Sequence, residues 1–159
     1  MAEESSTEDS LQLTPIGYLI SQKKNKFDAP HQPDHSDETI DYIKLVKKKN
    51  YEHGLEDLEG FSHIWLISWF HKNTSWKSKV LPPRGKQKKR GVFATRSPHR
   101  PNPLGLTAVK LVKIENNNIY IGSHDLIDGT PIFDIKPYLK YNDITVSYTH
   151  LTLPTNREV

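Results

Sequence analysis

The chain of 159 residues contains no cysteine. The absence of thiols excludes a disulfide framework and a thiolate zinc site, and it is typical of a protein in a reducing compartment. The longest apolar run, HIWLISWF, is far shorter than the ~20 residues that a helix needs to cross a bilayer. The first ten residues, MAEESSTEDS, are acidic and polar, unlike a signal peptide. These absences predict a soluble, cytoplasmic, single-domain protein.

Acidic residues are missing from a long internal window. No aspartate or glutamate lies between Gly60 and Ile114, and 13 of the 19 carboxylates precede Gly60. The window holds these cations: Lys72, Lys77, Lys79, Arg84, Lys86, Lys88, Lys89, Arg90, Arg96, Arg100, Lys110 and Lys113. Such segregation predicts one strongly positive face, as in proteins that bind nucleic acid. A solvated loop with an accidental run of charge is the alternative.

Several well-known enzyme motifs are absent. The sequence has no G-x-G-x-x-G, no P-loop, no H-E-x-x-H and no nucleophile elbow. Its eight histidines include no pair at i, i+4 spacing on a predicted helix. We therefore predict no metal site.

What is present favours a β protein. Runs rich in β-branched and aromatic residues predict strands at 13–21, 39–48, 62–71, 91–96 and 130–139, and a hairpin over 106–123. The run at 62–71 is apolar on both faces, which predicts a central buried strand, and residues 50–61 predict a short helical turn. Pro137 confines the last strand to an edge or an end. We predict a mainly β fold, a small antiparallel barrel with one short helical segment, over residues 12–144, after a disordered acidic tail at 1–11.

The segment RGVFATRSPHRPNPLG, residues 90–105, is a candidate binding loop. Its three prolines fix their own φ and restrict the residues before them, so the loop is stiff. Arg96 and Arg100 offer planar forks for a carboxylate or phosphate, and Asn102 suits an adenine edge or a ribose. Gly105 permits close approach of backbone or ligand. A rigid structural turn with solvated arginines is the alternative.

A second candidate is GSHDLIDGTPIFD, in which Asp125 and Asp128 flank two apolar residues. One carboxylate could bind a ribose or an ammonium group, and the other could act as a base. Turn and capping chemistry, a common use of aspartate, is the alternative.

Four segments together, GVFATRSPHRPNPLGL, LEGFSHIWLISWFH, FDAPHQP and HDLIDGTPIFDIKPYL, resemble the TsaA-like (TrmO) family. The resemblance runs from about residue 13 to 143. It implies an S-adenosylmethionine-dependent tRNA methyltransferase, a dimeric β-barrel outside the Rossmann class. The implied reaction methylates N6 of the threonylcarbamoyl-adenosine next to the anticodon of threonine tRNA.

The resemblance also implies site residues. The cofactor-binding positions are Pro30, His31, Gln32, His71, Lys72, Arg96, Leu106, Ser123, His124, Asp125 and Leu126. His31 replaces an arginine that is usual in the family, and Lys72 replaces a glutamine of bacterial members. Asp128 is the predicted catalytic base, with Asp125 as the alternative. Predicted contacts to the anticodon stem-loop of the tRNA are Arg84, Lys88, Lys89, Arg90, Arg100 and Asn102.

The C-terminal residues stand apart from this pattern. VSYTHLTLPT resembles the translation of a sequencing adaptor, so residues 145–159 are predicted to be a non-native tail. Many bacterial members of the family carry a further C-terminal domain. Two rival functions stay open: a non-catalytic RNA-binding barrel, and a dimerisation module whose proline-rich loop joins two barrels.

Overall fold

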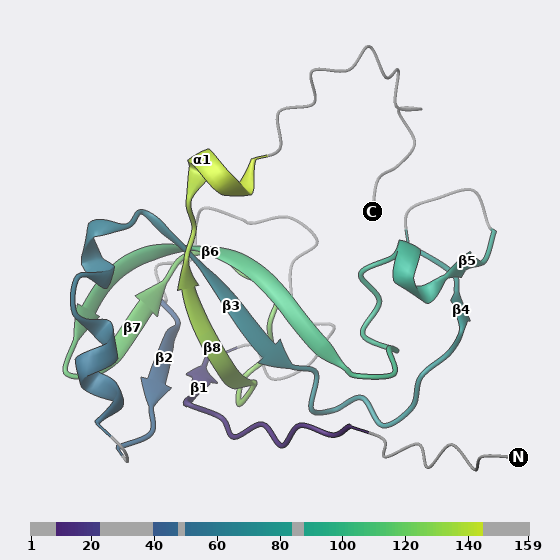
Figure 1. Cartoon of the computed structure of the whole chain (residues 1–159), viewed down its shortest axis with the longest axis horizontal. Helices are drawn as coiled ribbons and strands as arrows, with labels where there is room; N and C mark the ends of the chain where they lie inside the picture. Colours follow the sequence, from purple (N-terminus) through teal and green to yellow (C-terminus); the bar gives the residue numbers. More distant parts are fainter. Residues whose placement is uncertain (1–8, 23–39, 48–49, 84–87, 145–159) are drawn as a thin grey trace, which may run out of the picture.

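The computed structural model describes residues 9–22, 40–47, 50–83 and 88–144, and these are mainly β-structure (Figure 1). Six strands pair antiparallel in a closed ring, in the order β1-β2-β7-β6-β3-β8. The strands are β1 (Gly17–Ile20), β2 (Tyr42–Leu45), β3 (His63–Trp69), β6 (Leu104–Glu115), β7 (Asn118–Ile121) and β8 (Pro131–Pro137). The predicted mainly β fold is confirmed. Residues 1–8 and 145–159 lie outside the described residues, so the two predicted tails are not tested.

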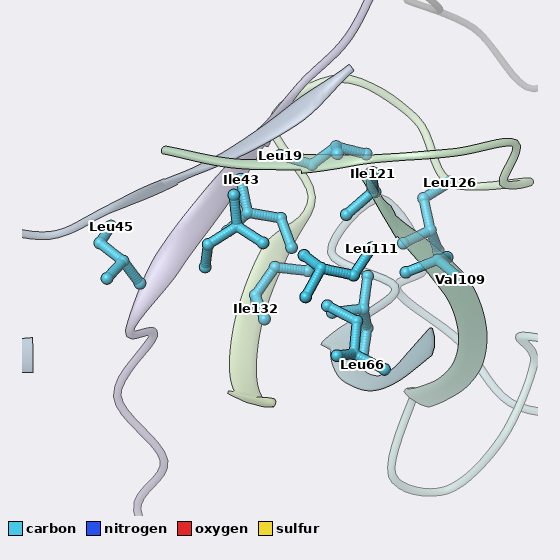
Figure 2. Packing of buried hydrophobic residues seen from close by; sticks show 11 residues of the cluster. Leu19, Ile43, Leu45, Leu66, Val109, Leu111, Ile121, Leu126 and Ile132 are labelled. Atoms are coloured by element: carbon cyan, nitrogen blue, oxygen red, sulfur yellow. The ribbon is translucent and has the colours of Figure 1, made fainter. Parts of the chain in front are cut away.

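The core fills the inside of the ring. Alternate residues of each strand point inward, so leucine, isoleucine and valine from all six strands form one cluster (Figure 2). Its fully buried members are Leu19, Ile43, Ile64, Leu66, Val109, Ile119, Ile121 and Ile132. Closure of the ring gives each of its six strands a partner on both sides, and side chains fill the interior.

Strand β3 was predicted to be buried on both faces, and this is correct for one face only. Ile64, Leu66 and Ser68 are buried, whereas the outward residues are half-buried or exposed. The outer face is covered in part by aromatic side chains: Trp65 packs on Tyr138 at a centroid distance of 5.3 Å, and Trp69 stacks on Phe133 at 6.3 Å. These aromatic neighbours explain why the run looks apolar on both faces.

The β6–β7 hairpin confirms the predicted turn. Asn116 and Asn117 have φ of 50° and 63°, the left-handed region that a two-residue turn requires at both central positions. Asparagine tolerates this region better than other residues with a side chain. Of the two positions predicted for Pro137, the strand end is confirmed, since Pro137 is the last residue of β8. The edge is not, because β8 pairs with β1 on one side and β3 on the other.

The helical content is small. The predicted turn after β2 consists of two 3₁₀ helices, η1 (Tyr51–Leu55) and η2 (Leu58–Gly60). A short helix, α1 (Lys140–Asp143), follows β8 and was not predicted. Among the residues described, no helix is long and apolar enough to cross a membrane.

The connection between β3 and β6 forms an arm that projects from one end of the barrel (Figure 1). It carries a two-stranded sheet of β4 (Lys79–Val80) and β5 (Arg90–Gly91), followed by the 3₁₀ helix η3 (Val92–Ala94). The prediction of a strand over 91–96 was therefore wrong beyond Gly91. The carbonyl of Val92 accepts hydrogen bonds from the backbone N–H and the hydroxyl of Thr95, which turn the chain back on itself.

Gly105 is the position where β6 comes closest to its neighbours. A Cβ atom there would lie 2.6 Å from Ser68 Oγ and 2.9 Å from Phe70 Cζ. Ser68 is its partner across the β3–β6 pair and is fully buried. The close approach therefore belongs to Ser68 and Phe70, which are packing neighbours and not a ligand.

We expect Gly105→Ala to destabilise the fold by about 1–3 kcal/mol, because both neighbours must move out of a packed site. Urea unfolding followed by tryptophan fluorescence measures this loss. Gly54→Ala is the matched control, since nothing lies within 4 Å of a Cβ at that position. Equal stability of the two variants would contradict the packing role.

Candidate functional site

Three chain segments meet at one end of the barrel and enclose a pocket of about 220 Å³. The first segment follows β3, the second belongs to the proline-rich loop, and the third precedes β8. Its lining comprises Phe70, His71, Lys72, Asn73, Arg96, Pro98, Asp125, Leu126, Ile127 and Thr130. Five of the predicted cofactor-binding residues are thus brought together: His71, Lys72, Arg96, Asp125 and Leu126.

The pocket combines an apolar floor with charges of both signs. Phe70, Pro98, Leu126 and Ile127 supply apolar and aromatic surface. Cationic and anionic side chains stand beside it, namely Lys72, Arg96 and Asp125. A ligand with a flat ring, a carboxylate and a positively charged group matches these three kinds of surface.

Asn73, which the sequence analysis did not single out, joins two of the pocket walls. Its side-chain amide donates to the carbonyl of Pro98 at 2.7 Å and to the carbonyl of Ser75 at 3.0 Å. The backbone N–H of Phe70 donates to the carbonyl of Pro103 at 2.8 Å. The proline-rich loop is therefore fixed to the end of β3. A polar residue four positions after the last residue of β3 was the only signal in the sequence.

Arg100 braces the proline-rich loop from within. Its Nη1 atom donates to the carbonyls of Val92 at 3.1 Å, Thr95 at 2.7 Å and Ser97 at 3.4 Å. Its guanidinium also lies 5.8 Å from the ring centre of Phe93. Arg100 thus holds the turn that leads into Arg96, a structural role that the sequence analysis named only as an alternative. Its predicted contact with tRNA is not tested.

A buried polar cluster supports the third wall. Nε2 of His124 lies 2.7 Å from Oδ2 of Asp41, and the two side chains are 1% and 11% exposed. Nδ1 of the same ring accepts a hydrogen bond from the backbone N–H of Leu126, which places the ring proton on Nε2. Ser21 also donates its hydroxyl to Asp41. His124 therefore orients the wall but does not line the pocket.

The two candidate bases occupy different places. Asp125 lines the pocket and is exposed. Asp128 does not line it; its Oδ1 accepts the backbone N–H of Ser21 at 2.9 Å, next to a turn in which Gly129 has a φ of +76°. This contact spans 107 residues, so it differs from the local turn and capping chemistry that the sequence analysis gave as the alternative, and the predicted role of Asp128 as base is not tested.

The remaining predicted residues lie elsewhere. Leu106 is 58% exposed on β6, and neither it nor Ser123 lines the pocket. Lys88, Lys89 and Arg90 are exposed on the arm, and Asn102 is exposed in the proline-rich loop. Pro30, His31, Gln32 and Arg84 lie outside the described residues. Within the described ranges, no group of three or more histidine, aspartate or glutamate side chains could hold a metal ion.

Comparison with known proteins decides the family. Residues 18–144 match the family model for the tRNA-methyltransferase O N-terminal domain. The chain belongs to the tRNA-methyltransferase O family. A crystal structure of TrmO from Pseudomonas aeruginosa superimposes with a TM-score of 0.72 at 35% identity, covering 89% of this chain and 61% of that one. The recognition made from the four sequence motifs is confirmed.

Two relatives show how far the likeness to tRNA-methyltransferase O proteins extends. A mouse protein named tRNA (adenine(37)-N6)-methyltransferase is 48% identical over 82% of this chain but only 31% of its own length. An Archaeoglobus fulgidus protein named S-adenosyl-L-methionine-binding protein is 40% identical over 79% of this chain and 88% of its own length. The chain thus spans about a third of the mouse relative and most of the archaeal one.

Proposed function

We propose that the chain is an S-adenosylmethionine-dependent methyltransferase that acts on N6 of an adenosine beside the anticodon of a tRNA. The observation that carries the proposal is the pocket, because it brings together five predicted residues from three separate segments of the sequence and matches the cofactor's chemistry. The names of the mouse and archaeal relatives support the same activity. The threonylcarbamoyl group on the adenosine, threonine tRNA and a cytoplasmic location are the finer parts of the proposal.

The pocket residues fit the parts of the cofactor. Lys72 and Arg96 would pair with its carboxylate. Asp125, beside the same pocket, would act as the base that takes up the proton from N6 of the acceptor. Phe70, Leu126 and Ile127 would pack on the adenine. The cofactor supplies an activated methyl group, and the protein positions the acceptor and excludes water. Pro30, His31, Gln32, Leu106, Ser123 and His124 stay proposed members of the cofactor site.

The described pocket is smaller than the ~300–1,000 Å³ typical of pockets for ligands of this size. It would therefore enclose one part of the cofactor. We propose that a second copy of the chain completes the site in a homodimer. Lys88, Lys89 and Arg90, together with Arg84, Arg100 and Asn102, would contact the stem-loop, mainly through phosphates that position the RNA.

Two measurements on the purified chain test this function. Calorimetry should show binding of S-adenosylmethionine, and labelled cofactor should transfer its methyl group to threonine tRNA that carries threonylcarbamoyl-adenosine. We expect Arg96→Ala to weaken cofactor binding about tenfold or more, since it removes a charge-assisted contact. Lys113→Ala is the control, because Lys113 pairs with Glu115 on the hairpin and does not line the pocket.

The outcomes separate the rival functions. Cofactor binding without methyl transfer to any tRNA would favour the non-catalytic RNA-binding barrel. Absence of cofactor binding would contradict the proposal that the chain is a methyltransferase. Methyl transfer to tRNA that lacks the threonylcarbamoyl group would support the proposed methyltransferase activity but contradict the proposed substrate.

A further inference from the structure

Phe93 is an aromatic side chain whose exposure the fold does not require. It is 79% exposed in η3, on the arm that projects from the barrel. Its neighbour Val92 is 1% exposed and anchors the same short helix. The helix is therefore held in place by Val92. Phe93 faces solvent, which is unfavourable for a large apolar side chain.

The exposed ring is held in a defined position. The guanidinium of Arg100 lies 5.8 Å from the centre of the Phe93 ring, and its Nη1 is itself fixed by three carbonyls of the same turn. The carbonyls of Val92 and Thr95 lie on either side of Phe93 and Ala94, so the guanidinium fastens both ends of η3. A partner that stacks on the ring would then need little further ordering.

The segment of the chain around Phe93 carries positive charges and no carboxylates. Lys88, Lys89 and Arg90 precede it on the same arm and are exposed. No acidic residue occurs between Gly60 and Ile114, and the arm lies within this window. Exposed aromatic rings among cations are how proteins hold unpaired nucleobases, because the cations attract the backbone and the ring stacks with the base.

Phe93 is also close to the pocket along the chain. Arg96, which lines the pocket, follows it by three residues, so their Cα atoms are at most about 11 Å apart. That distance corresponds to about three nucleotides at the stacked rise of ~3.4 Å. A base on Phe93 would therefore belong to a nucleotide near the one that is presented to the cofactor.

We infer that Phe93 is a stacking platform for an unpaired nucleobase of a single-stranded RNA loop, next to the target nucleotide. The inference takes the identity of the RNA from the proposed function. What it adds is a residue, Phe93, that would allow the protein to distinguish an unpaired loop from a duplex. Phosphate contacts from the lysines do not make this distinction, since a duplex presents phosphates too. A stacked base must be free of its partner strand.

The experiment compares two RNAs and three substitutions. The RNAs are the anticodon stem-loop of a threonine tRNA and a continuous duplex built from the same stem. Phe93→Trp enlarges the π face, Phe93→Leu keeps apolar bulk without a π face, and Phe93→Ala removes both. We expect the leucine and alanine variants to bind the stem-loop about 5- to 150-fold more weakly. The tryptophan variant should retain binding, and duplex binding should not change in any of them.

A double substitution, Lys88→Ala with Lys89→Ala, is the electrostatic control. It should weaken stem-loop and duplex together and reduce the slope of log affinity against log salt by roughly 1 to 2. The Phe93 variants should leave that slope unchanged. Thermal unfolding and cofactor affinity, measured for every variant, show that the arm and the pocket are intact.

Three results would overturn the inference. Phe93→Leu could bind the stem-loop as tightly as the original chain, the Phe93 variants could lose duplex binding equally, or Phe93→Ala could convert a dimer to a monomer with RNA affinity per chain unchanged. The last result would assign the ring to contact between copies. If the chain transfers methyl groups but Phe93→Leu binds the stem-loop with unchanged affinity, only the stacking role of Phe93 is refuted. Loop binding through Phe93 without any methyl transfer refutes only the proposed enzyme.

Discussion

Asp125→Asn is expected to lower the rate of methyl transfer by about 10²- to 10⁴-fold, the usual contribution of a general base. In the proposed substrate, threonylcarbamoyl-adenosine, N6 belongs to a urea-like group and is a poor nucleophile, so its proton would have to leave as the methyl group arrives. In the proposed reaction the bound cofactor would supply the methyl group that becomes bonded to N6, and the Asp125 carboxylate would take up the proton that N6 loses. An asparagine amide cannot take up that proton. Single-turnover kinetics with saturating cofactor measure the step.

Asp128→Asn is the matched control, since both substitutions remove one negative charge from the same segment. The carboxylate of Asp128 accepts the backbone N–H of Ser21 and does not line the pocket. We expect this variant to keep its transfer rate and to lose thermal stability. If Asp128→Asn instead lost transfer at unchanged stability, Asp128 would be the base, as the sequence analysis proposed. A weaker cofactor affinity of Asp125→Asn, at an unchanged rate, would assign Asp125 to cofactor binding alone.

His124→Ala is expected to cost about 2–4 kcal/mol of stability and to lower Tm by roughly 5–15 °C. The substitution removes a hydrogen bond to the Asp41 carboxylate at 2.7 Å and leaves the backbone N–H of Leu126 without its acceptor. His124 is 1% exposed, so water does not readily replace these partners. Because Leu126 lines the pocket, cofactor affinity should fall as well. Calorimetric unfolding and cofactor titration measure the two effects.

His53→Ala provides the control for a histidine–carboxylate pair. His53 lies 3.5 Å from Glu56, and both side chains are more than 70% exposed. An exposed pair of this kind contributes little, so its removal should leave Tm and cofactor affinity almost unchanged. Equal effects of His124→Ala and His53→Ala would show that the buried cluster does not support the pocket wall.

The sequence alone determined the strand pattern and the family. Strands follow from local composition: β-branched residues at 63–69 and at 106–121 and the two asparagines at the hairpin turn act within a few residues. The charge segregation and the four motifs are also properties of the chain as written. These features predicted a mainly β fold, a basic face and the tRNA-methyltransferase O family before any contact between distant residues was known.

Only the tertiary structure decided which residues share a pocket and which support it. Asp125 and Asp128 look equivalent in sequence, yet Asp128 bonds to Ser21 at a separation of 107 residues. Arg100 looks like a surface cation, yet its Nη1 bonds to three carbonyls of its own loop and converts the expected strand after Gly91 into a turn. The partner of His124, Asp41, lies 83 residues away. The hydrogen bonds of Asp128 and His124 join residues far apart in the chain, and those of Arg100 depend on how its own loop is folded. Composition within a short window carries no information about either kind of contact.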